Sequence, residues 1–259
     1  MFTKLIAANW TSLKYIKNYD NLNQFVPYQQ MIKMHVDNVL EKAAALQAER
    51  GRVVPIRILE AGAGTGNITL AVASNLLYRS IPFKYVAFDH DDNMRAAGAK
   101  KLARLNLPEN KLALYPGDLT KPDLGLPVLL HKSDVIIMNN VLYLFPDDVK
   151  YAILHNLSHN YLANNGIFLL CEPKAKGEFT YLDMLKPHLK HKGFFHTTFF
   201  MLPKLLKLQQ GEKDLINKKF MISGLRQKEL LVKAGFNIYK IEDAYGQANK
   251  YFSCSTRPS

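Results

Sequence analysis

The chain has 259 residues, with 34 lysines and arginines against 22 aspartates and glutamates, so its formal net charge is +12. A composition of 48% hydrophobic and 22% charged residues is that of a globular protein and excludes a largely disordered chain. The length suits one large domain with an addition, or two small domains.

The sequence favours a soluble protein of a reducing compartment. No apolar run reaches the roughly 18–20 residues that a membrane span needs. The amino terminus has the short apolar stretch 5–8, where a secretory signal needs about 7–15 apolar residues. Cys171 and Cys254 are too few for a disulfide framework or a zinc site, so we expect both to be reduced and packed. These features predict a cytoplasmic protein.

Most of the positive charge lies in the last third of the chain. Residues 174–259 hold 16 lysines and arginines against 7 acidic residues, a net charge of +9, whereas residues 1–173 have a net charge of +3. Such a distribution can mark a surface for nucleic acid, anionic lipid or an anionic substrate. Solubility alone explains it equally well.

Helix and strand patterns alternate along the first two thirds of the chain. A helix is expected at 27–48, before the first strand, and further helices at 67–77, 92–105 and 147–162, the last with the Asp147–Asp148 pair as its N-cap. Apolar runs predict strands at 56–60, 84–89, 111–115, 133–138 and 167–171. Apolar strands separated by helices indicate a parallel sheet covered on both faces.

The pattern changes after Pro173. Residues 174–222 show no clear strand, and helical order resumes at 225–234, with Gly235 as a C-cap. Two closing strands are expected at 236–241 and 251–254. The chain thus divides into a helical amino-terminal extension (1–55), an α/β core (56–173), a helical insertion (174–222) and a closing segment (223–259).

The most informative segment is a glycine-rich turn that leaves the first strand and enters a helix. It reads E-x-G-x-G-x-G from Glu60 to Gly66. Glycines let the backbone turn tightly and approach a ligand, and the helix start offers free N–H groups to an anion or carboxylate. The G-x-G-x-x-G dinucleotide spacing fails because Asn67 and Thr69 stand where a third glycine is required. No Gly-Lys-Ser/Thr follows, which excludes a Walker A loop.

Polar residues stand at the ends of three further strands. Asp89, Asp118 and Asn139 each follow an apolar run, and ligands of open parallel sheets bind beyond the carboxyl ends of the strands. We therefore expect these side chains to share one crevice with Gly64. An aspartate after a strand is, taken alone, more often a turn former or helix cap, and we interpret Asp91 and Asp92 in that way.

In these segments the sequence resembles the class I S-adenosylmethionine (SAM)-dependent methyltransferases. The resemblance covers residues 56–173, and more loosely 220–256. It is carried by the glycine turn, by Phe88–Met94, Gly117–Leu119 and Leu162–Pro173, and by the Asp134–Pro146 segment that is typical of small-molecule enzymes. The family usually has an apolar residue against adenine where this chain has His90.

The resemblance implies a Rossmann-like sheet of seven strands, mostly parallel, with helices on both faces, an antiparallel last strand and a helical lid. It implies SAM as the methyl donor and in-line transfer to an acceptor, without assigning a catalytic residue. The cofactor contacts that it implies are Glu60, Gly62, Ala63, Gly64, Gly66, Asp89, His90, Met94, Asp118, Leu119, Asn139 and Asn140.

The segment after the fourth strand separates methyltransferase subclasses. Asn140-Val-Leu-Tyr143 lacks the proline of adenine-N6 enzymes and favours a small-molecule acceptor. An RNA adenine methyltransferase remains the alternative, because the first motif is similar to that class and the carboxyl third is basic. We expect neither a metal-dependent catechol-type site nor a cysteine nucleophile, since oxygen ligands do not cluster and both cysteines fall in core strands.

Residues 11–30 and 174–222 are the expected walls of the acceptor site. Five side chains are candidates for contact with the cofactor or acceptor or for a role near the methyl group, although each is more often a packing or surface residue: Tyr19, Tyr28, Gln29, Tyr143 and His196. The stretch 194–208 is the most apolar part of the insertion and carries Lys204 and Lys207. It is interpreted as an apolar wall over the active site or, less favoured, as a surface for a membrane or lipid-like acceptor.

Overall fold

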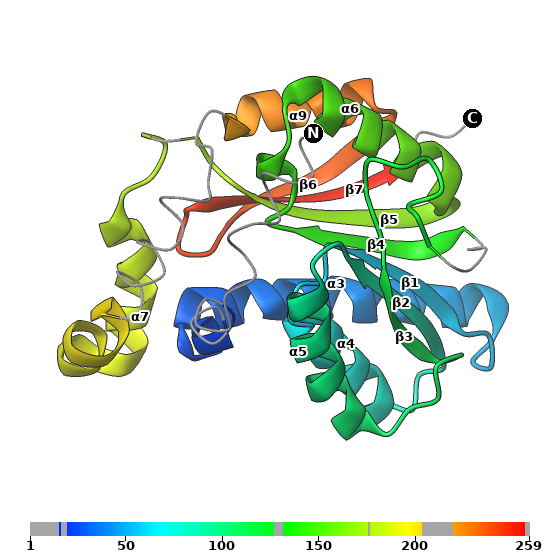
Figure 1. The fold of residues 1–259 in the computed structure, drawn as a ribbon, viewed down its shortest axis with the longest axis horizontal. Coiled ribbons are helices and arrows are strands. Elements are labelled where there is room, and N and C mark those ends of the chain that lie inside the picture. Colours follow the sequence, from blue (N-terminus) through cyan, green and yellow to red (C-terminus); the bar gives the residue numbers. More distant parts are fainter. Residues whose placement is uncertain (1–15, 17–19, 127–131, 176, 204–219, 257–259) are drawn as a thin grey trace.

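The computed structural model describes residues 16, 20–126, 132–175, 177–203 and 220–256. Their centre is a seven-stranded sheet with the order β3-β2-β1-β4-β5-β7-β6 (Figure 1). The strands are β1 (Ile56–Ala61), β2 (Phe83–Asp89), β3 (Leu112–Pro116), β4 (Ser133–Asn139), β5 (Leu162–Pro173), β6 (Phe236–Ala244) and β7 (Asn249–Thr256). Strands β1 to β5 pair in parallel, and β7 runs antiparallel to both β5 and β6. The expected fold class is confirmed.

Helices cover both faces of this sheet (Figure 1). On one side lie α3 (Val26–Arg50), α4 (Asn67–Tyr78) and α5 (Asp92–Leu102), and on the other lie α6 (Asp147–Asn156) and α9 (Gly224–Lys233). Alternate strand residues feed two cores, because successive side chains of a strand point to opposite faces. Ile58 packs with the α3 side and Leu59 with the α6 side.

Two α-helices end earlier than expected, because the chain continues in another helical conformation. The helix expected at 147–162 is α-helical to Asn156 and continues as a π-helical turn, Leu157–Tyr161. The helix expected at 92–105 ends as α5 at Leu102 and continues as a 3₁₀ turn. The prediction that the Asp147–Asp148 pair forms the N-cap of α6 was wrong. Pro146 is the N-cap and no side chain caps this helix, since Asp147 already lies in its first turn.

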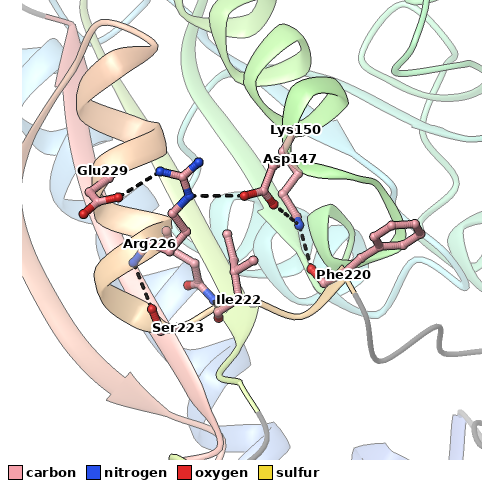
Figure 2. A network of polar contacts seen from close by, with 8 residues as sticks. Asp147, Lys150, Phe220, Ile222, Ser223, Arg226 and Glu229 are labelled. Atoms are coloured by element: carbon pink, nitrogen blue, oxygen red, sulfur yellow. Dashed lines mark hydrogen bonds and ion pairs between the residues drawn. The ribbon is translucent and has the colours of Figure 1, made fainter.

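Asp147 belongs instead to a network that fixes the carboxyl end of the insertion (Figure 2). The buried Lys150 ammonium donates to Asp147 Oδ1 at 3.0 Å and to the carbonyl of Phe220 at 2.6 Å. From α9, Arg226 Nε donates to Asp147 Oδ2 at 3.2 Å. Phe220 is therefore tied to both helices on that face of the sheet.

The described part of the insertion is a helical arm. It comprises α7 (Tyr181–His196) and a π-helical turn (Thr197–Met201), with a kink at Gly193, where φ is 79° and ψ is 169°. Thr180 and Asp183 form a capping box at the start of α7. In Figure 1 the arm lies to one side of the sheet, next to the beginning of α3. Lys204 and Lys207 lie outside the described residues.

None of the helices within the ranges given above is long and apolar enough to cross a membrane.

A buried carboxylate joins three elements at the amino ends of β1 and β4. Asp134, with a side chain 1% exposed, accepts hydrogen bonds from the backbone N–H, Nε and Nη2 of Arg57 and from Nη1 of Arg50, at 3.0–3.1 Å. Burial opposes ionisation of this carboxyl, but the hydrogen bonds from the two arginines outweigh it and lower its pKa. The end of α3 is thereby held against the sheet.

Asp134→Asn should lower the free energy of unfolding by about 2 kcal/mol, because it removes the charge that two partly buried guanidinium groups share. A lowered folded-state pKa means that this stabilisation is complete above about pH 4 and is lost as the pH falls through the folded-state value. Urea denaturation of both proteins at several pH values measures the difference.

The control is Asp37→Asn, which breaks an exposed ion pair with Lys33 and should change stability by less than about 0.5 kcal/mol. A difference between wild type and Asp134→Asn that does not shrink with falling pH would contradict the electrostatic origin.

Candidate active site

The glycine turn folds back over the end of β2. Its three glycines have positive φ values: 76° at Gly62, 54° at Gly64 and 71° at Gly66. The N–H groups of Gly62 and Ala63 both donate to the carbonyl of Phe88 at 2.9 Å. A Cβ on Gly62 would stand 2.4 Å from Val141 Cγ2, whereas nothing lies within 4 Å of one on Gly64. Gly62 therefore serves packing, and Gly64 leaves backbone open to a ligand.

Asp89 meets this turn, as the sequence predicted. Its Oδ2 accepts from the N–H of Gly64 at 2.7 Å, and its Oδ1 accepts from the N–H of Asp91 at 2.9 Å. Burial raises the pKa of Asp89, partly offset by these two hydrogen bonds. Asp91 caps α5 by accepting from the N–H of Met94, which confirms its expected role.

Glu60 is a fully buried acid beside the turn. Burial raises its pKa to about 7, although hydrogen bonds from the hydroxyls of Thr69 and Tyr85, both 2.6 Å from Oε2, favour the ionised form. Sequence reasoning missed both donors. Tyr85 comes from the neighbouring strand, where it is the β2 partner of Ile58, so its proximity to Glu60 depends on strand register.

A small cavity opens beside the turn. Its lining residues come from β1, the turn, α3, α4 and the end of β4: Tyr28, Glu60, Gly62, Ala63, Asn67, Ile68 and Asn139. The buried side chains of His35 and Asn139 face each other, and within the described residues neither His35 Nε2 nor Asn139 Oδ1 has any other hydrogen-bond partner. Burial lowers the pKa of His35 to about 4, although the interaction with Asn139 acts in the opposite direction. Asn139 lines the cavity with an acceptor that only His35 approaches, which makes it a candidate acceptor for a ligand donor.

Polar contacts fasten the amino-terminal segment to the turn. Thr65 Oγ1 donates to Asp20 Oδ1 at 2.6 Å, and Lys101 Nζ donates to the same oxygen at 2.9 Å. Lys101 also donates to Asn67 Oδ1, which accepts from Asn23 Nδ2 at 3.0 Å as well. The segment before α3 thus lies over the start of α4, beside the cavity. This network was not expected from the sequence.

The remaining predicted cofactor residues do not line this cavity. His90 is exposed, and Asp118 accepts from the N–H and hydroxyl of Thr120, which together with the nearby His90 lower its pKa against the effect of burial. Met94 and Leu119 are buried in opposite cores. Asn140 accepts from Asn249 Nδ2 at 2.6 Å. Their contact with a cofactor stays a prediction.

The predicted acceptor-side residues are scattered. Tyr28 lines the cavity, and its hydroxyl accepts from Asn67 Nδ2 at 3.4 Å. Gln29 is exposed and donates to the carbonyl of Asn23. His196 lies on the arm, 3.1 Å from His188. Tyr19 falls outside the described residues.

Tyr143 is held by a clamp that sequence reasoning missed. The fully buried Glu172 carboxylate accepts the N–H groups of Val141, Leu142 and Tyr143 at 2.7, 2.9 and 3.2 Å. Burial raises its pKa to about 7, and these hydrogen bonds act in the opposite direction. One carboxylate at the end of β5 thus fixes the loop after β4, including the Val141 side chain that abuts Gly62.

Neither cysteine is poised for nucleophilic chemistry. Cys171 and Cys254 are unpaired and buried, as expected, and burial raises the pKa of both thiols far above the ordinary value. Among the residues with described positions, no three His, Cys, Asp or Glu side chains are grouped so as to hold a metal ion.

The family model described as a methyltransferase domain matches residues 59–168, from β1 into β5. The matched segment is therefore similar to a methyltransferase domain. The turn, Asp89, the Glu172-clamped loop and Asn139 all fall within or beside the matched segment. No curated protein sequence matches the chain.

Solved structures share the fold of this chain at low identity. Magnesium protoporphyrin IX methyltransferase from Synechocystis PCC 6803, solved with bound SAH, is 15% identical, with a TM-score of 0.61 over 98% of this chain and 100% of that one. The DszA carbon methyltransferase is 16% identical, with a TM-score of 0.59 over 89% of this chain and 55% of that one. A pericyclic reaction enzyme is 12% identical, with a TM-score of 0.55 over 83% of this chain and 47% of that one. The chain therefore spans about half the length of the latter two.

Glu172→Gln should lower the free energy of unfolding by about 2 kcal/mol at about pH 8. The amide has one acceptor oxygen for three converging N–H groups, and its own NH₂ would face one of them. The midpoint of urea denaturation reports the loss, and amide hydrogen exchange at Val141–Tyr143 should become faster.

Glu229→Gln, at an exposed acid of α9, is the matched control and should leave the midpoint unchanged. Unaltered exchange in the loop after β4 of Glu172→Gln would contradict the clamp.

Proposed function

We propose that the protein transfers the methyl group of SAM to a small-molecule acceptor without a metal ion. The observation that carries this proposal is the open backbone of Gly64 against the carboxylate of Asp89, within the segment that is similar to a methyltransferase domain. A carboxylate at the end of β2 is placed to accept both hydroxyls of a ribose. By their titles, one of the neighbours named above is a magnesium protoporphyrin IX methyltransferase with bound SAH and another is a carbon methyltransferase, which supports the same proposal.

The cavity residues suit the amino-acid end of such a cofactor. SAM carries an ammonium group, a donor and a cation, and would place it between Asn139 Oδ1, which only His35 approaches, and the buried Glu60. A cation there would favour the ionised form of Glu60 and donate to Asn139. Of the predicted cofactor residues, we therefore propose Glu60, Gly62, Ala63, Gly64, Asp89 and Asn139 as contacts.

The residues of this chain have little covalent chemistry to perform. When bound, SAM supplies a methyl group already activated by its sulfonium sulfur. The amino-terminal segment fastened at Asp20 and the loop fixed by Glu172 border the site and can exclude water and orient the acceptor. We assign residues 56–173 and 223–259 to cofactor binding, and residues 1–55 and 174–222 to the acceptor side. The comparisons do not favour the RNA alternative.

Asp89→Ala should weaken the binding of S-adenosylhomocysteine (SAH) at least tenfold, because it removes the ribose acceptor and frees the N–H of Gly64. Wild type should gain about 2.7 kcal/mol of stability at about 100 times the dissociation constant. Isothermal titration calorimetry and thermal unfolding with SAH measure both effects.

Asp92→Ala is the matched control, three residues along the chain with a side chain 88% exposed, and it should bind SAH as wild type does. No heat and no thermal shift with either SAM or SAH in the wild type would overturn the proposed function.

SAH affinity should rise roughly fivefold to tenfold from about pH 6 to about pH 8. Burial places the pKa of Glu60 at about 7, and a bound ammonium favours the carboxylate, so binding below that pH must displace a proton. Calorimetry at about pH 6 in two buffers of different ionisation enthalpy should show release of close to one proton.

Glu60→Gln keeps an acceptor oxygen for Thr69 or Tyr85 but cannot ionise. It should bind SAH more weakly, and its SAH affinity should not change between about pH 6 and about pH 8. The neutral His35, with a pKa of about 4, titrates outside this range. A profile that stays sloped in Glu60→Gln would assign the proton to another group.

A further inference from the structure

Four phenylalanines of the arm are exposed to solvent. Phe194, Phe195, Phe199 and Phe200 are 70%, 71%, 59% and 58% exposed, and the rings of Phe195 and Phe199 lie 4.6 Å apart. This aromatic patch begins directly after the kink at Gly193. The expectation that this stretch forms an apolar wall fails for these side chains. Clustered exposed apolar side chains mark interaction surfaces.

The arm packs against the rest of the protein through its buried side, and the exposed phenylalanines take no part in this contact. His188 is fully buried, its Nδ1 accepts the N–H of Val26 at 3.2 Å, and its ring lies 5.3 Å from that of Phe25. Thr197 and Met201 are buried as well, and Met201 belongs to the core on the α3 side. The arm that carries the exposed phenylalanines is therefore itself packed against the rest of the protein.

The charge next to the patch is positive. Residues 184–203 contain three lysines and no aspartate or glutamate, and of these lysines only Lys186 is shown in an ion pair, with Asp183 at the start of α7. Lys190, His191 and Lys192 are exposed and immediately precede Gly193 and the patch. An apolar patch flanked by lysines complements a surface that offers anionic groups next to hydrocarbon.

We propose that the arm docks on an anionic membrane surface, with the aromatic patch at the boundary of headgroups and acyl chains and with Lys190 and Lys192 at the headgroups. A second copy of the chain is a poorer partner, because a two-fold contact between identical arms would bring like charges together. Docking goes beyond the proposed function and needs no cofactor.

The test is co-sedimentation of the full chain with vesicles of mixed phosphatidylglycerol and phosphatidylcholine, and with vesicles of phosphatidylcholine alone. Wild type should bind the anionic vesicles at least tenfold more tightly, and added salt should weaken that binding. The variant F194S/F195S/F199S/F200S should lose binding about 100-fold, and K190Q/K192Q about tenfold.

The control V53S/Y78S removes two apolar side chains elsewhere that are even more exposed than the phenylalanines, and it should sediment as wild type does. Circular dichroism and SAH calorimetry on each variant separate docking from folding and from the proposed function, since both should be unchanged.

Three results would overturn the proposal: wild type that sediments with neither vesicle, a serine variant that sediments as wild type does, or binding to RNA in place of vesicles. If the serine variant instead turns a dimer into a monomer, or raises KM without any vesicle binding, the patch belongs to a second copy or to the acceptor site.

Discussion

Two hydrogen bonds, from the N–H groups of Gly62 and Ala63 to the carbonyl of Phe88, bend the chain over the end of β2, and the arrangement of the site depends on this bend. It requires a positive φ at Gly62 and no side chain there, because Val141 occupies the space that a Cβ would take. Val141 is in turn fixed through its N–H by Glu172 on β5. Four neighbouring strands, β2, β1, β4 and β5, thus contribute to the shape of one turn, and the result is an open backbone at Gly64 held against Asp89.

The two buried glutamates show how similar burial gives different roles. Each has its pKa raised to about 7, but Glu172 is surrounded by three fixed backbone donors that occupy it fully. Glu60 accepts two hydroxyl hydrogen bonds on one oxygen and lines a cavity together with Asn139. A bound cation can lower the free energy of the second arrangement, whereas the first already has the Lys150 ammonium nearby, which acts to lower the pKa of Glu172. The fold does not decide this, since a pericyclic reaction enzyme shares it. The argument for methyl transfer therefore rests on the site.

Much of this arrangement could be predicted from sequence, and the failures have physical causes. Apolar runs and glycine spacing depend on local chemistry, so the order of the strands, the turn and the meeting of Gly64 with Asp89 were predicted correctly, although β5 begins at Leu162, five residues before the expected strand. Contacts set by register and tertiary packing were not, because Tyr85 reaches Glu60 across a strand pair and Glu172 reaches Val141 across 31 residues of chain. Phe194 to Phe200 were interpreted as a wall because apolar sequence favours burial. Which side of a helix packs against the body depends on its anchors, here His188 and Met201.

The arm and the turn are held by separate sets of contacts, and this separation constrains what each can do. The turn is fixed by β2, by the Glu172 clamp and by the Asp20–Lys101 network, none of which includes a residue of the arm. The arm is fixed to the start of α3 through Val26, and Phe220 at the far end of the insertion is fixed to α6 through Lys150. Since α3 also supplies Tyr28 to the cavity, it is the element through which a force on the arm would reach the site. The arm and the cavity therefore meet on one helix, α3, at Val26 and Tyr28.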